Sequence, residues 1–166
     1  ERVVSVLVMA LGAGLLAANV LVVGRLAARL GGERAGAASS LLAAGSFGLA
    51  FWTLRGMEVG LLALVLGCLL LWASELTAQN CERLVLRAAV VGALGTAIRP
   101  DAVVPLAIAA ATLVACAPSQ KRLRCIGVFG CSFAVALGLQ FGLERAYYGS
   151  WVPNTYFLKM TGVPTT

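Results

Sequence analysis

The stretch TAIRPDAVVPLA, residues 96–107, decides the fold, because Arg99, Pro100 and Asp101 together interrupt a long apolar segment. Pro100 lacks a backbone N–H and disfavours a helical conformation at Arg99, so one helix is expected to end near Ile98 and another to begin at Pro100. Asp101 then lies in a first helical turn, where a carboxylate complements the helix dipole. If residues 88–117 formed one broken helix instead, the chain after them would emerge on the opposite side of the membrane.

Outward from this stretch, the chain is a succession of apolar runs. Of its 166 residues, 60% are hydrophobic and 12% are charged, and the mean hydropathy is +0.93, whereas an ordinary soluble domain carries about 25% charged residues. The sequence therefore predicts an all-α polytopic membrane helix bundle, one domain over 1–166, with about six transmembrane or re-entrant helices. Because it opens with Glu, we expect a fragment of a longer chain. The predicted runs are 3–24, 36–54, 57–74, 84–98, 102–117 and 126–143.

Length divides these runs into two groups. The first, second, third and sixth are long enough to cross a bilayer, which takes about 17–25 residues, whereas 84–98 and 102–117 are short. Tilting or re-entrant geometry would accommodate the short pair, so the sequence leaves open whether they span fully.

The basic residues predict the orientation. The chain carries a net charge of +6, from 13 Lys and Arg against 7 Asp and Glu. Eight basic residues fall in the alternate connections 25–35, 75–87 and 118–125, against five on the other side, which places these connections in the cytoplasm as ordinary solvated loops. No nucleic-acid-binding motif accompanies the positive charge, so no nucleic-acid partner is expected.

The remaining connections then share the extracytoplasmic face, and each carries an arginine close to an acid. They are LRGME at 54–58, IRPDA at 98–102 and ERAYYGSWVPNTYFLKM at 144–160. Helix N-termini near residues 57 and 100 would open toward this face, where nearby arginines favour a phosphate. The candidate anion-binding residues are Arg55, Arg99 and Arg145, and the candidate carboxylates for catalysis are Glu58 and Asp101. The alternative is that both breaks are interfacial turns, with Gly56 and Pro100 as structural residues.

The segment 144–160 concentrates aromatic and neutral polar side chains. Aromatic faces and amide or hydroxyl groups suit a sugar or a lipid head group, although an aromatic belt at the membrane interface explains part of the pattern. Gly149 and Pro153 are expected to set turns. The candidate ligand-binding residues here are Tyr147, Tyr148, Asn154, Thr155 and Lys159.

The sequence shows no cofactor motif and no metal-ligand spacing, and it leaves a divalent metal ion open. The five cysteines form no CxxC pair and are interpreted as small buried apolar residues.

Three segments resemble the multi-spanning bacterial GT-C glycosyltransferases, especially arabinofuranosyltransferase-like members. They are WTLRGMEVGLLAL (52–64), TAIRPDAVVPLA (96–107) and RAYYGSWVPNTYFLK (145–159), which correspond to GMET-like, RPE/RPD-G-like and YYG…PNT…K stretches in that order. Val59 stands where Thr is common and Ala102 where Gly is common. The matching positions are Gly56, Met57, Glu58, Arg99, Pro100, Asp101, Tyr147, Tyr148, Gly149, Pro153, Asn154, Thr155 and Lys159.

The resemblance implies transfer of a sugar from a polyprenyl-phosphate donor to a glycan or lipid acceptor, outside the bacterial cytoplasmic membrane. It also implies that the catalytic acid lies upstream of this chain, so the general base is unknown and Glu58 and Asp101 are more plausible as positioning groups. Two other hypotheses remain. One is a transporter or flippase of a lipid-linked or anionic solute, and the other is a structural membrane subunit that uses the GxxxG pairs Gly56/Gly60 and Gly138/Gly142.

Overall fold

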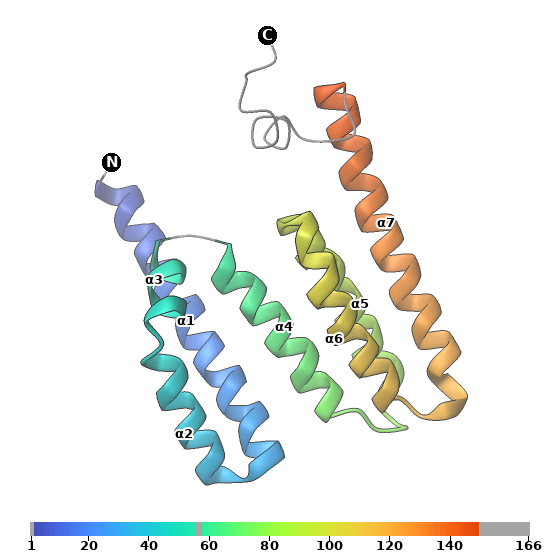
Figure 1. Cartoon of the computed structure of the whole chain (residues 1–166), viewed down its shortest axis with the longest axis horizontal. Coiled ribbons are helices and arrows are strands. Elements are labelled where there is room, and N and C mark those ends of the chain that lie inside the picture. The colour runs from blue at the N-terminus through green and yellow to red at the C-terminus, as the bar shows by residue number, and fades with distance from the viewer. Residues whose placement is uncertain (1, 56–57, 150–166) are drawn as a thin grey trace.

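The structure is a computed structural model that describes residues 2–55 and 58–149, and this part of the chain is a bundle of helices without strands (Figure 1). The helices are α1 (Arg2–Gly31), α2 (Glu33–Ala44), α3 (Phe47–Leu54), α4 (Val59–Ser74), α5 (Cys81–Ile98), η1 (Pro100–Ala102), α6 (Val103–Cys116), η2 (Ser119–Lys121) and α7 (Arg122–Tyr148). The all-helical prediction is confirmed.

Helices α1, α4 and α6 run in one direction and α2, α3, α5 and α7 in the other, so all connections except the bend between α2 and α3 gather at two ends of the bundle. The breaks after α3 and α5 and the C-terminus of α7 lie at one end, the upper end in Figure 1, which we call the Arg99 end. The connections after α1, α4 and α6 lie at the other, which we call the Arg29 end. Helices α5 and α6 pack against each other and against α4, so residues 88–117 form two antiparallel helices and the single broken helix is wrong.

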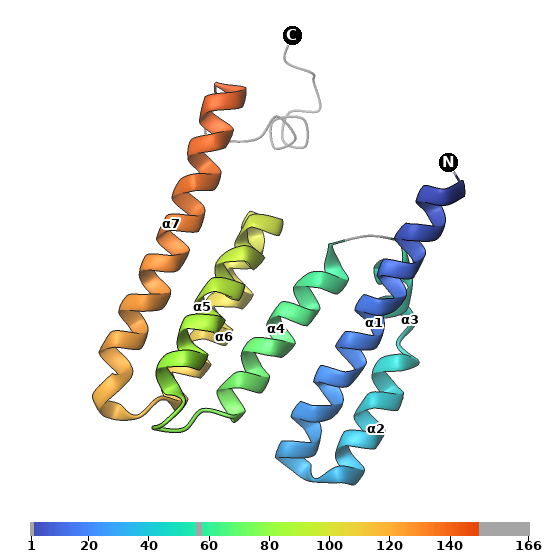
Figure 2. The same ribbon diagram turned by 180° about the vertical axis from the view of Figure 1, so that it is seen from behind.

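In both views the helices form a row from α2 and α3, through α1 and α4, to α5 and α6, and finally α7 (Figures 1 and 2). The core lies where α4, α5, α6 and the first half of α7 meet, around Leu69, Leu106, Leu113 and Phe129. Small residues let these helices approach closely. A Cβ atom on Gly95 would lie 2.9 Å from a methyl carbon of Leu106.

Large apolar side chains also cover the outside of the bundle. Leu42, Phe47 and Leu123 are 76%, 77% and 84% exposed. Such a surface is unfavourable in water and favourable in hydrocarbon, so the apolar helices are consistent with a membrane protein. Cys81 and Cys125 are buried as predicted, whereas Cys116 and Cys131 are exposed, which corrects the interpretation of all five cysteines as buried.

Span lengths differ from the prediction in two places. Within the described residues, two helical segments are long and apolar enough to cross a membrane, Val3–Gly31 and Ser119–Tyr148. The run 36–54 is not one straight span but the pair α2 and α3, bent by 55°. Ser46 causes the break by capping α3, since its hydroxyl accepts a hydrogen bond from the N–H of Leu49 at 3.4 Å.

The third run is also shorter than expected. Helix α4 has 16 residues, about 24 Å at 1.5 Å per residue, against a hydrocarbon core of about 30 Å. The bent pair α2–α3 counts as a third candidate span if it crosses as a unit.

Candidate functional site

The Arg99 guanidinium joins two chain breaks at the Arg99 end of the bundle. Its Nη1 atom lies 3.1 Å from Oε1 of Glu58, 41 residues away in the sequence. Its Nε and Nη2 atoms bind Oδ1 and Oδ2 of Asp101 at 3.0 and 2.9 Å. This bidentate pairing fixes the guanidinium plane, and we call the three residues the Arg99 cluster.

Local backbone chemistry places Arg99 and Asp101. Arg99 ends α5 in an extended conformation, with φ −148° and ψ 124°, because the proline ring that follows disfavours the helical region. Pro100 opens the short 3-10 helix η1 and α6 begins at Val103. The predicted helix end at Ile98 is therefore confirmed, and the new helix starts at Pro100 through a 3-10 turn.

Glu58 comes from the start of α4, which tertiary contacts hold in place. Glu58 is the N-cap residue of α4 but its side chain caps no backbone N–H, so the carboxylate is available to Arg99. Two residues further on, the Gly60 carbonyl accepts a hydrogen bond from Nδ2 of Asn19 in α1 at 2.9 Å. Gly60 also packs so closely on Thr53 that an added Cβ would lie 2.4 Å from its hydroxyl oxygen. The start of α4 is thus fixed by α1 and α3.

Two pockets with apolar walls flank the Arg99 cluster. On one side Arg99 and Asp101 border a pocket of about 240 Å³ whose walls include Leu62, Leu66 and Leu106. On the other side Glu58 borders a pocket of about 420 Å³ between α1, α3 and α4. That second pocket is lined by Val8, Leu11, Gly12, Leu15, Thr53, Glu58 and Leu61. The cluster thus offers charged groups at the mouths of two apolar cavities.

The electrostatics of the cluster favour a fixed, fully charged arginine. The hydrogen bonds and negative charge of Asp101, with a smaller contribution from Glu58, raise the pKa of the Arg99 guanidinium above its ordinary value. Three of its N–H groups point to these carboxylates, and a guanidinium carries five. Two donors therefore remain for a ligand. The side chains of Arg99 and Glu58 are 44% and 36% exposed, so the cluster is open to the surroundings.

Arg55 lies at the same end but outside the Arg99 cluster. It is the C-cap residue of α3, and its guanidinium carbon sits 4.5 Å from the ring centre of Phe51. This cation–π contact leaves its N–H groups available, and no ion pair joins it to the other described residues.

The end of α7 does not complete the cluster. Helix α7 extends past η1 in both views (Figures 1 and 2), which places its last turns beyond the Arg99 cluster. Tyr147 and Tyr148 are exposed and contact each other edge to face, with ring centres 4.8 Å apart. Arg145 donates to the carbonyl of Gly149, which ends the helix with a left-handed φ of 71°. Gly56, Pro153, Asn154, Thr155 and Lys159 lie outside the described residues.

Two features of the structure were not predicted from the sequence. The first is the hydrogen bond from Asn19 in α1 to the Gly60 carbonyl in α4. The only sign of it in the sequence is a single amide side chain within a long apolar run. The second is charge pairing at the Arg29 end, where Arg29 pairs with Glu75 at 3.0 Å and Arg124 with Glu82 at 2.7 Å. These ion pairs are largely exposed, with side chains 50% and 30% exposed in the first and 70% and 57% in the second, so they link neighbouring helices at a surface compatible with the expected solvated loops.

Among residues 2–55 and 58–149, no three His, Cys, Asp or Glu side chains converge as a metal site would require. No family model, curated protein or solved structure matches this chain. Any function must therefore be argued from the sequence and the geometry.

Proposed function

We propose that this chain is the membrane-embedded part of a glycosyltransferase, located in the bacterial cytoplasmic membrane with its active face outside. It would move a sugar from a polyprenyl-phosphate donor to a glycan or lipid acceptor. The observation that carries the proposal is the Arg99 cluster, in which a guanidinium held by two carboxylates borders a pocket with apolar walls. A donor of this class has the matching shape, because an anionic phosphate joins a sugar to a long apolar chain.

Charge balance assigns the roles within the site. Glu58 and Asp101 together outweigh Arg99 by one negative charge, so the cluster alone disfavours an anion and a further positive charge is needed beside it. Arg55, which is free of ion pairs to the described residues, supplies the second positive charge at this end. In the proposed site Arg99 and Arg55 hold the phosphate, while Glu58 and Asp101 orient the Arg99 guanidinium.

The proposed transfer is a displacement at the anomeric carbon of the donor sugar. The acceptor hydroxyl oxygen forms a bond to the anomeric carbon as the bond from that carbon to the phosphate oxygen breaks. The hydroxyl proton goes to a carboxylate, and the phosphate keeps the bonding electrons. The two arginines stabilise the negative charge that grows on the leaving phosphate. In this scheme the proton acceptor is a carboxylate other than Glu58 and Asp101, and the donor or acceptor is contacted by Tyr147, Tyr148, Arg145, Asn154, Thr155 and Lys159.

The test is sugar transfer by the purified protein from a labelled polyprenyl-phosphate sugar. Arg99→Ala should lower transfer at least about 10-fold, because losing one positioned donor to a developing anion costs about 100-fold or more in well-studied enzymes. Arg124→Ala is the matched control, since it removes an ion pair of similar length at the opposite end. Unchanged transfer by a normally inserted Arg99→Ala variant would rule out the proposed role.

Orientation is tested separately, in a cysteine-free version of the protein. Ala146→Cys and Ser119→Cys place single thiols at exposed positions near opposite ends of α7. A membrane-impermeant maleimide should label Ala146→Cys in intact cells and Ser119→Cys only after lysis. The reverse pattern would put the Arg99 cluster in the cytoplasm and contradict an extracytoplasmic active face.

A second candidate, a transporter of a lipid-linked or anionic solute, is favoured by the bent pair α2–α3. Broken helices line the substrate sites of many transporters near the middle of the membrane. In this chain the charges lie at the end of the bundle rather than at the bend, which favours the transferase. Solute movement without formation of a sugar-transfer product would reverse that preference.

A further inference from the structure

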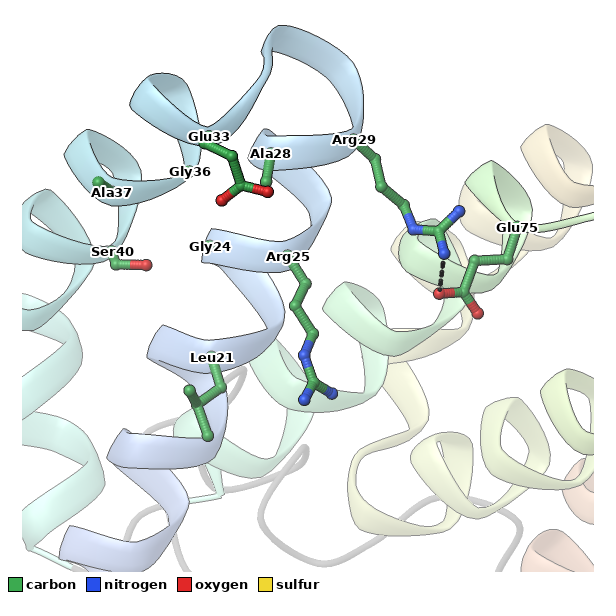
Figure 3. A pocket seen from close by; sticks show the side chains of 10 residues that line it. All are labelled: Leu21, Gly24, Arg25, Ala28, Arg29, Glu33, Gly36, Ala37, Ser40 and Glu75. Atoms are coloured by element: carbon green, nitrogen blue, oxygen red, sulfur yellow. Dashed lines mark ion pairs between the residues drawn. The ribbon is translucent and has the colours of Figure 1, made fainter.

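A third pocket, with a more polar lining, lies at the Arg29 end, on the far side of the bundle from the Arg99 cluster. It has a volume of about 590 Å³ and lies between α1, α2 and the end of α4 (Figure 3). Its lining residues are Leu21, Gly24, Arg25, Ala28, Arg29, Glu33, Gly36, Ala37, Ser40 and Glu75. The proposed sugar transfer makes no use of this pocket.

The hollow exists because the floor is made of small residues. Helices α1 and α2 touch so closely that a Cβ on Gly36 would lie 2.7 Å from Cβ of Ala28. A Cβ on Gly24 would lie 2.0 Å from the hydroxyl oxygen of Ser40. The long side chains lie at the edge of the pocket, where Arg25 and Arg29 extend from α1 and Glu33 extends from α2 (Figure 3). The pocket is a shallow basin with charged walls.

The rim carries two positive and two negative charges, but only half of them are satisfied. Arg29 pairs with Glu75 at 3.0 Å. Arg25 and Glu33 form no ion pair or side-chain hydrogen bond with the other residues that the structure describes. An anionic ligand would satisfy Arg25 and leave Glu33 beside a like charge. A ligand with both an anionic and a cationic group satisfies both residues.

We propose that this pocket binds a zwitterionic phosphoethanolamine head group. The phosphate binds Arg25 and the free N–H groups of Arg29, because guanidinium groups match phosphate oxygens. The ammonium binds Glu33, and the Ser40 hydroxyl donates to a phosphate oxygen. Leu21, 60% exposed at the edge of the pocket, leads the acyl chains toward the apolar outer surface of α1. The ligand is therefore phosphatidylethanolamine in the leaflet that meets the Arg29 end.

The net charge separates this ligand from an anionic lipid. Basic residues at a membrane surface ordinarily attract anionic head groups. Within the pocket Glu33 and Glu75 balance Arg25 and Arg29, so the lining carries no net charge and its preference depends on the individual contacts to the head group. The pocket is consequently expected to prefer phosphatidylethanolamine to phosphatidylglycerol.

The experiment compares the two lipids on the purified protein in detergent. Lipids with identical acyl chains are titrated, and bound lipid is counted by native mass spectrometry. Arg25→Gln should weaken phosphatidylethanolamine binding about 10-fold or more, the usual cost of losing a charge-assisted hydrogen bond. Glu33→Gln should weaken phosphatidylethanolamine binding while strengthening phosphatidylglycerol binding, an opposite response that general destabilisation does not produce.

Three further variants make the test specific. Arg34→Gln removes a charge from the same connection but outside the pocket, and it should change neither affinity. Ala37→Phe fills the basin without altering charge, and it should weaken both lipids. Arg25→Lys keeps the charge but loses the bidentate geometry, so it should retain partial binding. It replaces Arg25→Gln in the test if Arg25→Gln fails to fold.

Soluble competitors separate the head group from a simple anion. Phosphoethanolamine should displace the lipid more effectively than inorganic phosphate, because only the former reaches Glu33. Equal competition by inorganic phosphate, a preference of the unaltered protein for phosphatidylglycerol, or equal losses in Arg34→Gln and Arg25→Gln would each overturn the proposal. Loss of sugar transfer in Arg99→Ala has no bearing on these outcomes, so the two proposals fail independently.

Discussion

The ion pairs of the Arg99 cluster allow the loss of stability in an Arg99→Gln variant to be predicted. Arg99→Gln removes the ion pairs to Glu58 at 3.1 Å and Asp101 at 2.9 Å and leaves two carboxylates close together. These side chains are 44%, 36% and 68% exposed, so each pair has the value of a screened surface pair, about 0.2–1 kcal/mol. We expect a total loss of about 1 kcal/mol. That corresponds to a fall of about 2–4 °C in the thermal midpoint for a chain of this size.

A double-mutant cycle isolates the contact between Arg99 and Glu58. Thermal unfolding in detergent is measured for Arg99→Gln, Glu58→Gln and the double variant, with helicity as the readout. We expect a coupling energy of about 0.5 kcal/mol, because the pair links residues 41 positions apart only in the folded state. Arg124→Gln, which breaks an exposed 2.7 Å pair with Glu82, shows the cost of an ion pair at the other end. A coupling energy of the opposite sign, in which Arg99 and Glu58 destabilise each other, would refute their pairing.

Other predictions concern packing. Asn19→Leu should destabilise the bundle by about 1 kcal/mol, read from its thermal midpoint in detergent, because the Gly60 carbonyl loses its 2.9 Å interhelical hydrogen bond. Gly60→Val should cost about 1–3 kcal/mol by overpacking, whereas Gly138→Val should be nearly neutral, since an added Cβ meets no neighbour within 4 Å there. Equal costs for the two glycine variants would contradict the close contact of α3 and α4. The sulfur atoms of Cys81 and Cys125 lie 4.0 Å apart, so a membrane-permeant oxidant should link them into an intramolecular disulfide, detected by mass spectrometry of digests. Recovery of both as free thiols would contradict the packing of α5 on α7.

The functional proposal depends most on how charge is arranged at the Arg99 end. Glu58 and Asp101 use three donors of Arg99, so the cluster positions a guanidinium more than it supplies free positive charge. The proposal therefore depends on whether Arg55 supplies the additional positive charge. If Arg55 and Arg99 act together on one phosphate, Arg55→Ala and Arg99→Ala should each lower transfer, and the double variant should lose less than the product of the two effects.

Much of the helical architecture follows from the sequence alone, because the rules that produce it act over a few residues. Apolar runs became helices, and the end of α5 at Ile98 followed from the steric effect of Pro100 on Arg99. The alternation of the other connections between the two ends also followed, since each of them, unlike the bend between α2 and α3, separates two antiparallel helices. The bend between α2 and α3 was readable in principle from Gly45 and Ser46, but the uniform hydropathy of 36–54 concealed it.

The sites were decided by tertiary structure. Sequence proximity associated Arg55 with Glu58 and Arg99 with Asp101. In the structure Arg99 does pair with Asp101, but Glu58 also pairs with Arg99, and Arg55 instead contacts the ring of Phe51. That choice depends on where the start of α4 lies relative to η1, and Asn19 and the close contacts of Gly60 fix this start against α1 and α3. The basin of Arg25 and Glu33 likewise exists only because small residues draw α1 and α2 together. Local sequence sets where helices end, whereas the register between helices, and hence which charges meet, depends on side-chain shapes from segments far apart in the chain.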